Sequence, residues 1–479
     1  MKIDIDHLFS GQDELIHCLH IIGQKGEKVG YETYIVGGIV RDAFMGKAIT
    51  DLDVVVIGDA LTFAENLAKG LKAGPVVKFE QFGTAMIPYK PFRIEVVTAR
   101  KEVYQQDSRK PDVTFTDLTE DLRRRDFTIN AMAFGLNSDN FGELADPFNG
   151  REDLRKGIIR TPADPDITFS DDPLRMMRAV RFAGRLHFDI DPVTFAAISN
   201  NRERIAIVSA ERISDELNQI ILTDKPSEGF KYLDSSGLLE LILPEVHALK
   251  GIESYKGQKH KDNFYHTLEV LDNIALKSDN LWLRWAALLH DIAKPVTKKF
   301  EEGQGWTFHH HEYAGSRMIP AIFKRLKLPL DERMRYVRKL VFLHLRPIIL
   351  SQEQVTDSAV RRLLFEAGDD TDDLMMLCEA DITSKNEARV RQYLRNFELV
   401  REKMKSIEEK DHIRNFQPPV SGDVICEAFG ISPSKEVGII KNTIKNAILD
   451  GEIPNEYGPA WDLMVKKGKE LGLKLVSKL

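Results

Sequence analysis

Two aspartates two residues apart, close behind a pair of glycines, are the residues of this chain best suited to do chemistry. Asp51 and Asp53 begin the apolar run DLDVVVI, which is typical of a buried strand. Alternate residues of a strand face the same side, so the two carboxylates would project together, a costly arrangement unless a hard cation such as Mg²⁺ binds them. Gly37 and Gly38 let backbone N–H groups approach a phosphate. Together these residues predict metal-dependent nucleotidyl transfer.

The elements expected around these residues follow the order strand, diglycine, helix, turn, strand. YIV before the glycines and VVVI after the aspartates are short β-branched runs, and IVRDAFMGK between them has helical spacing that ends at Gly46. Arg41 lies on that helix, where it can contact phosphate or simply pair with an acid. Glu95 alternates with apolar neighbours in the run RIEVV. It can be a third carboxylate near the first two, or a half-exposed strand glutamate.

A second group of polar residues, in DLRRRDFTINAMAFG, precedes a strand-like run. Arg125 suits a triphosphate oxygen, and Asp126 can accept hydrogen bonds from ribose hydroxyls. Asn130 would face the same side as Asp126. Alone, this segment would read as a charged loop that enters a strand.

The segment SDDPLRMMRAVRF points to selection of a base. Asp172 and Arg175 are three residues apart, so on one helix they would be neighbours, either as an ordinary salt bridge or as a template for a base. Adenine and cytosine both present an amino donor beside a ring-nitrogen acceptor, which one carboxylate and one guanidinium match. Guanine and uracil present the opposite order and would be rejected. This interpretation predicts use of ATP and CTP without a nucleic-acid template.

Basic and acidic residues at helical spacing follow this pair. Arg178 and Arg181 continue the series of Arg175 and are candidates for contact with nucleotide or RNA. In SAERISDEL, Glu211, Arg212 and Glu216 can hold the base-reading pair in orientation, or form a salt-bridged helix surface.

Histidines and aspartates in the second half of the chain form another candidate site. Adjacent His and Asp at the end of the apolar run ALLHDIAKP are unusual, and buried imidazole with carboxylate favours a transition metal or Mg²⁺. Six such groups can converge in a helical bundle, or satisfy helix ends. They are His266, His290, Asp291, His311, His344 and Asp381.

Composition places the chain among ordinary proteins of several domains. It has 479 residues, of which 43% are hydrophobic and 29% charged. Cys18, Cys378 and Cys426 form no CxxC pair, MKIDIDHLFS lacks a signal-peptide core, and no run of eighteen apolar residues occurs. We therefore expect a cytoplasmic protein without a membrane span. The net charge of −7 neither indicates nor excludes a nucleic-acid partner.

The predicted fold class is α+β, with a mixed-sheet head followed by a helical body. β-rich runs nearly vanish after TPADPDITFS, and apolar residues then recur at spacings of three and four. The expected parts are a head (1–160), a helical neck that selects the nucleotide (161–245), a helical domain (246–400) and a helical tail (401–479).

In this order, the segments resemble the class II tRNA nucleotidyltransferase and bacterial poly(A) polymerase family of the polymerase β-like superfamily. GGIVRD with DLD looks like the family's motif A, RRDFTINAMA like motif B, DDPLRMMRAVRF like motif D and ERISDEL like motif E. Motif D usually begins Glu-Asp and here begins Asp171-Asp172. The stretch 99–122 is similar to the loop needed for terminal A addition. Residues 266–381 resemble an HD-type metal phosphohydrolase domain, less closely at His311 and His344 than at the other four positions.

The resemblance implies addition of CCA, or of its final A, to tRNA 3′ ends from CTP and ATP by two-metal chemistry with Mg²⁺. It also implies that neck, body and tail grip the tRNA acceptor arm, with no protein partner and a possible second divalent metal at the HD site. A poly(A) polymerase shares every motif named and stays an alternative. An alternative of another class is an HD phosphohydrolase whose head only binds RNA.

Overall fold

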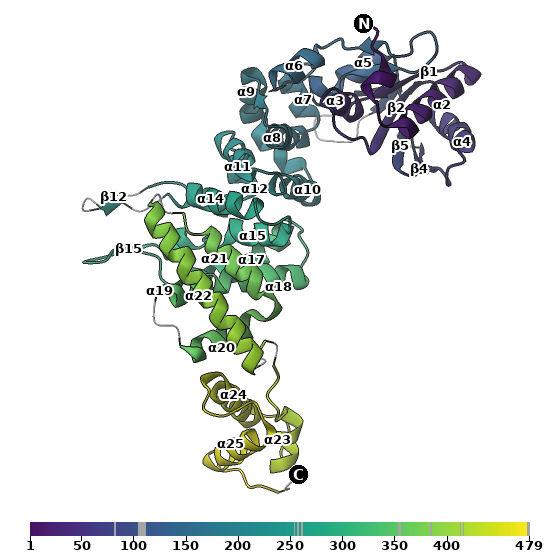
Figure 1. The fold of residues 1–479 in the computed structure, drawn as a ribbon. Helices are drawn as coiled ribbons and strands as arrows, with labels where there is room; N and C mark the ends of the chain where they lie inside the picture. Colours follow the sequence, from purple (N-terminus) through teal and green to yellow (C-terminus); the bar gives the residue numbers. More distant parts are fainter. Residues whose placement is uncertain are drawn as a thin grey trace. The chain divides into compact units, whose positions relative to one another are not determined.

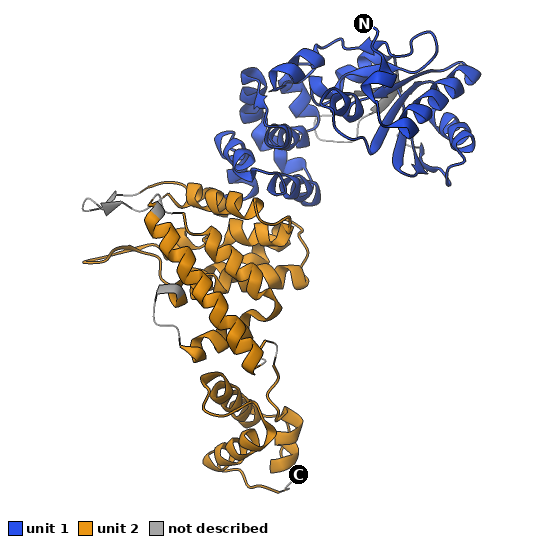
Figure 2. Cartoon of the chain, viewed as in Figure 1, with its two compact units in different colours: residues 1–244 blue, residues 245–479 orange. Residues whose placement is uncertain are grey.

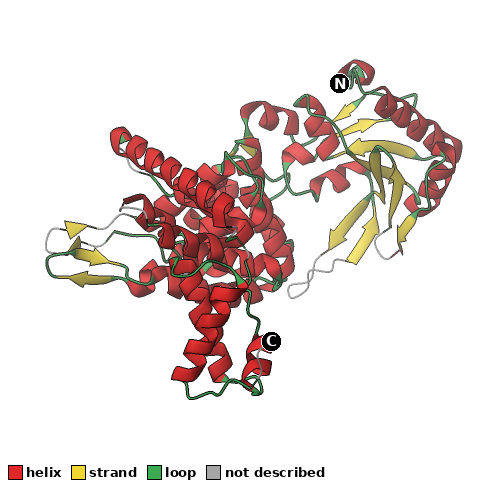
Figure 3. Cartoon of the chain, turned by 60° about the horizontal axis from the view of Figure 1, so that its bottom comes forward, coloured by secondary structure: helices red, strands yellow, loops and turns green. Residues whose placement is uncertain are grey.

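The structure is a computed structural model, which describes residues 1–80, 83–103, 112–252, 254–255, 258–259, 262–352, 356–383, 386–411, 413–414 and 416–476. The chain forms two compact units, Met1–Pro244 and Glu245–Leu479 (Figure 2). The large sheet belongs to the first unit, and the second is mostly helical (Figure 3). Among the described residues, no helix is long and apolar enough to cross a membrane. The division into four parts stays a prediction.

The first unit is built on a mixed seven-stranded sheet (Figure 1), as predicted for the head. Its strand order is β3-β4-β5-β2-β1-β8-β9, and β2 runs parallel to β5 while the other neighbours are antiparallel. The strands are β1 (Glu32–Val36), β2 (Asp51–Ile57), β3 (Val77–Phe79), β4 (Thr84–Tyr89), β5 (Phe92–Thr98), β8 (Ala133–Gly135) and β9 (Leu144–Ala145).

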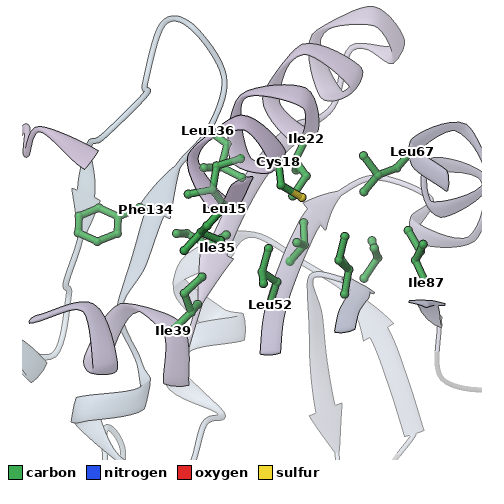
Figure 4. Packing of buried hydrophobic residues seen from close by; sticks show 14 of the residues in the cluster. Leu15, Cys18, Ile22, Ile35, Ile39, Leu52, Leu67, Ile87, Phe134 and Leu136 are labelled. Atoms are coloured by element: carbon green, nitrogen blue, oxygen red, sulfur yellow. The ribbon is translucent and has the colours of Figure 1, made fainter. Parts of the chain in front are cut away.

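One face of this sheet packs against helices α2 (Asp13–Val29) and α4 (Ala60–Leu71). Figure 4 shows Cys18 of α2 and Leu67 of α4 in the same buried cluster as Leu52 of β2. Because side chains alternate along a strand, Asp51 and Asp53 must face the side opposite to Leu52. The core therefore fixes the direction of both carboxylates.

The remaining elements of the first unit are mostly short helices. Helix α8 packs against α10 and α11, and a two-residue parallel pair, β10 with β11, lies among these helices. The bounds are α1 (Ile5–Leu8), α3 (Gly38–Phe44), β6 (Arg100–Val103), β7 (Asp112–Phe115), α5 (Leu118–Arg123), η2 (Thr128–Asn130), α6 (Gly150–Lys156), β10 (Ile158–Ile159), α7 (Pro165–Asp171), α8 (Leu174–Leu186), β11 (Asp189–Ile190), α9 (Pro192–Asn201), η3 (Arg202–Ile207), α10 (Ala210–Ile221), α11 (Pro226–Ser235) and α12 (Leu238–Ile242).

The strand expected over INAMAFG is shorter than the sequence indicated. Residues Thr128–Asn130 form a 3₁₀ turn, and only Ala133–Gly135 pair with the sheet. In the loop predicted over 99–122, β6 and β7 pair with each other, and residues 104–111 lie outside the described part of the chain.

The second unit holds the helices that carry the histidines. Helix α15 packs against α14 and α18, and α17 packs against α18. The bounds are α13 (Pro244–His247), β12 (Ser254–Tyr255), β13 (Gln258–Lys259), α14 (Asn263–Ala275), α15 (Leu281–Leu289), α16 (Lys294–Thr297), β14 (Lys299–Glu301), β15 (Gly305–Thr307), α17 (His311–Arg325), α18 (Glu332–Leu343), α19 (Leu345–Gln352), α20 (Asp357–Ala367), η4 (Gly368–Asp370), α21 (Thr371–Ala380), α22 (Glu387–Asp411), α23 (Gly422–Phe429), α24 (Lys435–Asp450) and α25 (Tyr457–Glu470).

Candidate active site and metal centre

The diglycine lies against a carboxylate and an arginine that are distant in sequence. Gly37 has φ of 78°, and a Cβ added to it would lie 3.0 Å from Nη1 of Arg125 and 3.6 Å from Oδ2 of Asp53. A side chain at this position would therefore be strained by the backbone and crowded by Arg125. Gly38 is the first residue of α3. The structure thus brings Gly37, Asp53 and Arg125 together.

The carboxylates lie on two adjacent parallel strands. In the register of β2 and β5, Asp53 is paired with Glu95 and Asp51 with Arg93. Nη2 of Arg93 lies 2.9 Å from Oδ1 of Asp51. Glu95 shares the strand face of Arg93, because both alternate with the buried Ile94. All three predicted carboxylates therefore lie on one face of the sheet.

The pKa values show that this face disfavours uncompensated negative charge. Burial raises the pKa of Asp53 above its ordinary value, and Asp51 raises it further while Arg125 lowers it. Burial, and then the charge of Asp53, raise the pKa of Glu95. Hard oxygen ligands that repel one another in this way fit a divalent cation such as Mg²⁺.

Asp121 holds the arginines of this site, and the sequence interpretation missed it. Its carboxylate is fully buried and accepts hydrogen bonds from Nη2 of Arg124 at 2.7 Å and from Nη2 of Arg125 at 3.2 Å. Burial alone would raise the pKa of Asp121, but Arg125 and Arg124 outweigh it and lower that pKa. The spacing of three and four residues in DLRRR was the available signal.

Asp126 is the centre of a hydrogen-bonded network that joins several segments. It accepts from Nη2 of Arg178 at 2.6 Å and from Nδ2 of Asn130 at 3.0 Å. Asn130 accepts in turn from Nη1 of Arg41 at 2.6 Å, and Nε of Arg41 donates to Asp42 at 2.8 Å. Burial would raise the pKa of Asp126, but Arg178 and Asn130 lower it to about 2. Arg41 is thus paired with an acid, one of the two alternatives its sequence position left open.

The base-reading pair differs from the expected arrangement on one helix. Asp172 has an extended backbone (φ −130°, ψ 93°) between α7 and α8, whereas Arg175 lies in the first turn of α8. The prediction that both share a helix is wrong, because the ring of Pro173 disfavours helical geometry for the residue before it. They remain neighbours, since the N–H of Arg175 donates to the carbonyl of Asp172 at 2.9 Å.

The residues expected to orient this pair divide into two sets. Nη2 of Arg212 lies 3.9 Å from Oδ2 of Asp172. Glu216 instead accepts from Nε of Arg181 at 2.6 Å and lies 4.0 Å from Nη1 of Arg178. Glu211 is exposed. Arg175 is anchored elsewhere, because its Nη2 donates to the carbonyl of Arg124 at 2.6 Å.

In the second unit, the structure brings all six predicted metal ligands to one place. They form two groups, His266 with His290 and Asp381, and Asp291 with His311 and His344, in which one ligand atom from each residue lies within 4.8 Å of the others. They come from α14 and α17 and from the ends of α15, α18 and α21. Most are buried, and Asp381 is partly exposed.

Asp291 connects the two groups. Its Oδ2 lies 3.3 Å from Nε2 of His290 and 3.6 Å from Nε2 of His266. Its Oδ1 lies 3.2 Å from Nε2 of His311 and 3.9 Å from Nε2 of His344. The carboxylate can therefore offer one oxygen to each group.

The histidines are oriented as metal ligands are. Nδ1 of His290, His311 and His344 each lies 2.6–2.8 Å from a main-chain carbonyl three residues before it. Nδ1 must then carry the proton of the neutral ring, so that Nε2 is the nitrogen that points into the cluster. Nε2 of His290 is buried without a hydrogen-bond partner. Burial lowers the pKa of His290, but Asp291 and Asp381 raise it to about 10. At neutral pH without metal, Nε2 of His290 therefore carries a proton, which a divalent cation bound there would replace.

Three family models match successive parts of the chain. The poly A polymerase head domain matches residues 33–160, and the probable RNA and SrmB-binding site of polymerase A matches residues 187–250. The HD domain matches residues 263–386. These matches contain the head site and the histidine cluster, whereas Asp172 and helix α8 lie between the first two matched segments.

Curated relatives match more than half of the chain. The Multifunctional CCA protein of Pseudomonas fluorescens strain Pf0-1 is 37% identical over 313 residues, which are 63% of this chain and 71% of that protein. The CCA-adding enzyme of Lactobacillus gasseri is 36% identical over 264 residues, which are 55% of this chain and 61% of that protein.

Solved structures share the fold over nearly the whole chain. The Thermotoga maritima CCA-adding enzyme in complex with tRNA is 22% identical, with a TM-score of 0.61 over 98% of this chain and 99% of that one. The Bacillus stearothermophilus CCA-adding enzyme in complex with CTP is 24% identical, with a TM-score of 0.63 over 95% of this chain and 98% of that one. At this identity the likeness concerns the fold.

Proposed function

This chain belongs to the CCA-adding enzyme family, and from that premise we propose that it adds CCA, or its terminal A, to tRNA 3′ ends from CTP and ATP. The observation that carries the proposal is the meeting of Gly37, Asp53 and Arg125 beside Glu95. It combines close access for a phosphate, oxygen ligands and a fixed guanidinium in one place.

The residues of the head would bind and orient the triphosphate. Asp51 and Asp53 would hold Mg²⁺, with Glu95 as a third carboxylate, and the bound ions would activate the tRNA 3′-hydroxyl and neutralise the triphosphate. Arg125, fixed by Asp121, donates toward phosphate oxygens. Asp126 keeps its charge at neutral pH and can accept from the ribose.

Selection of the base would belong to Asp172 and Arg175. A carboxylate acceptor beside guanidinium donors fits the edges of adenine and cytosine, and leaves a polar group unpaired against guanine or uracil. The carbonyl of Arg124 and the guanidinium of Arg212 would hold the two side chains in place.

A tRNA that ends at its discriminator base, offered with one nucleotide at a time and then with both, tests this proposal. CTP alone should add two residues, and ATP should add one to a tRNA that ends in CC. Growth of an A tail beyond one residue would instead support a poly(A) polymerase, which shares the same site residues. Failure to incorporate either nucleotide would contradict both.

We also propose that the histidine cluster holds divalent metal and supports hydrolysis of phosphate esters, because the buried Nε2 of His290 points into a set of six ligands. The tRNA acceptor arm, ATP and CTP are the proposed partners, in a cytoplasmic setting. Release of inorganic phosphate from nucleotide monophosphates by wild-type protein, and its loss in Asp291→Ala, tests the second activity. Unchanged release in that variant would contradict it.

A further inference from the structure

On helix α8, about two turns after Arg175, a phenylalanine ring lies among three guanidinium groups. The central carbon of the guanidinium lies 5.2 Å from the centre of the Phe182 ring for Arg41, 5.5 Å for Arg178 and 4.6 Å for Arg181. Phe182 itself is 5% exposed. Arginines at these distances from an aromatic ring are attracted by its quadrupole, most strongly where water is excluded.

Each of these arginines holds a different polar residue of the site. Arg41 donates to Asn130, Arg178 to Asp126 and Arg181 to Glu216. Three like charges that share one ring repel one another. Their acid partners lie on different segments and are Asp42, Asp126 and Glu216. The ring is the contact that all three guanidinium groups share.

Phe182 also contacts the segment that carries Asp126. Its ring meets the ring of Phe127 edge to face, with centroids 5.7 Å apart and an interplanar angle of 78°. Phe127 follows Asp126 directly, and its N–H donates to Oδ1 of Asp126 at 2.8 Å. Phe182 therefore contacts the Asp126 segment through Phe127 and through Arg178.

A nucleotide in this site must meet two sets of residues at once. Under the proposed function, its triphosphate and ribose lie against the head, and its base lies against Asp172 and Arg175 at the start of α8. The distance between these sets decides whether the base edge reaches its donors and acceptors. Phe182, on the same helix as Arg175, is placed to set that distance.

We propose that Phe182 is a positioning residue for nucleotide selection, whose ring fixes Arg41, Arg178 and Arg181 and thereby the spacing between Asp126 and α8. This inference rests on the proposed function, because it assigns the spacing to one bound nucleotide. A side chain of the same shape without the electron-rich ring face would not hold the three guanidinium groups in place, because that face attracts them.

Fluorinated phenylalanines separate the charge of the ring face from its shape. Mono-, di- and trifluorophenylalanine would replace Phe182 in the full chain, and the same series would replace Phe230. Phe230 is a fully buried residue of α11, with no arginine over its ring among the described residues. For each protein, kcat and KM for CTP, ATP and UTP, calorimetric Kd values for CTP and ATP, and the thermal midpoint are measured.

Each added fluorine at Phe182 weakens the attraction of the ring face for the guanidinium groups. The Kd values should therefore rise stepwise and the CTP-over-UTP ratio of kcat/KM should fall stepwise, each by roughly tenfold in total. The Phe230 series should change neither. A flat Phe182 series, or equal trends at both positions, would overturn the inference. If the unmodified protein incorporates no nucleotide, the proposed function fails, and a flat Kd series then independently rejects the role of Phe182.

Discussion

At the scale of single residues, charge compensation decides what each side chain in the head can do. Asp53 and Glu95 have raised pKa values because each is partly withdrawn from solvent and lies near another carboxylate, whereas Asp121 and Asp126 have lowered pKa values because arginines surround them. The first pair is therefore suited to a divalent cation. The other two aspartates are suited to fixing arginines and accepting hydrogen bonds.

Asp121→Asn tests the role of Asp121 in positioning Arg125. Removing a buried charge that two arginines share should lower the free energy of unfolding by about 3–5 kcal/mol and raise KM for both nucleotides. Denaturant unfolding and steady-state kinetics measure these effects. Asp117→Asn is the matched control, because Asp117 is the N-terminal cap of the same helix, α5, and asparagine caps well. Equal effects of the two substitutions would contradict the role.

Asp172→Asn tests the base template. Asparagine offers a donor as well as an acceptor, so rejection of uracil should weaken, and the ratio of kcat/KM for CTP over UTP should fall by about tenfold or more. Asp164→Asn, at the cap of the preceding helix α7, should leave that ratio unchanged. Kinetics with each nucleotide alone provide the ratio, and an unaltered ratio in Asp172→Asn would remove Asp172 from base selection.

The sequence was informative where the burial of a neighbouring residue fixes the direction of a side chain. The alternation in DLDVVVI predicted the shared face of Asp51 and Asp53, because burial of Leu52 fixes it. The role of Asp121 was missed, since acids and arginines at this spacing are common on exposed helices. The surroundings of Phe182 come from α3 and α8, with Phe127 preceding η2, and no single segment contains them.

At the scale of elements, helix ends carry most of the candidate metal ligands of the second unit. His290 and His344 directly follow α15 and α18, and His311 begins α17, where main-chain carbonyls can accept from Nδ1. The sequence could therefore indicate that these six residues converge, but not that they divide into two groups. That division depends on how α14, α15, α17, α18 and α21 pack, which spacing along the chain does not show.

His290→Ala tests the metal centre. Loss of the ligand with the unpartnered Nε2 should weaken Mn²⁺ binding by about tenfold or more, as measured by metal content after dialysis, and should leave nucleotide addition to tRNA unchanged. His310→Ala is the matched control, because His310 is next to His311 but its side chain is 85% exposed. Equal metal content in both variants would contradict the assignment.

At the scale of the whole molecule, an acidic chain acts on a polyanion. The net charge is −7, and the arginines near the nucleotide site are largely engaged with aspartates and Glu216. Contact with tRNA must therefore come from local patches and shape complementarity instead of overall charge. The candidate nucleotide site and the histidine cluster lie in different compact units, so the residues of one can be substituted without changing those of the other.

The most direct test of the proposed activity uses a tRNA whose 3′ end is its discriminator base, and sequences the 3′ ends after incubation with all four nucleotides. Wild-type protein should give ends that stop at CCA, and Asp53→Asn should reduce addition by at least about a hundredfold. Asp59→Asn, at the cap of α4, should behave as wild type. Long A tails, ends with G or U, or full addition by Asp53→Asn would contradict the account.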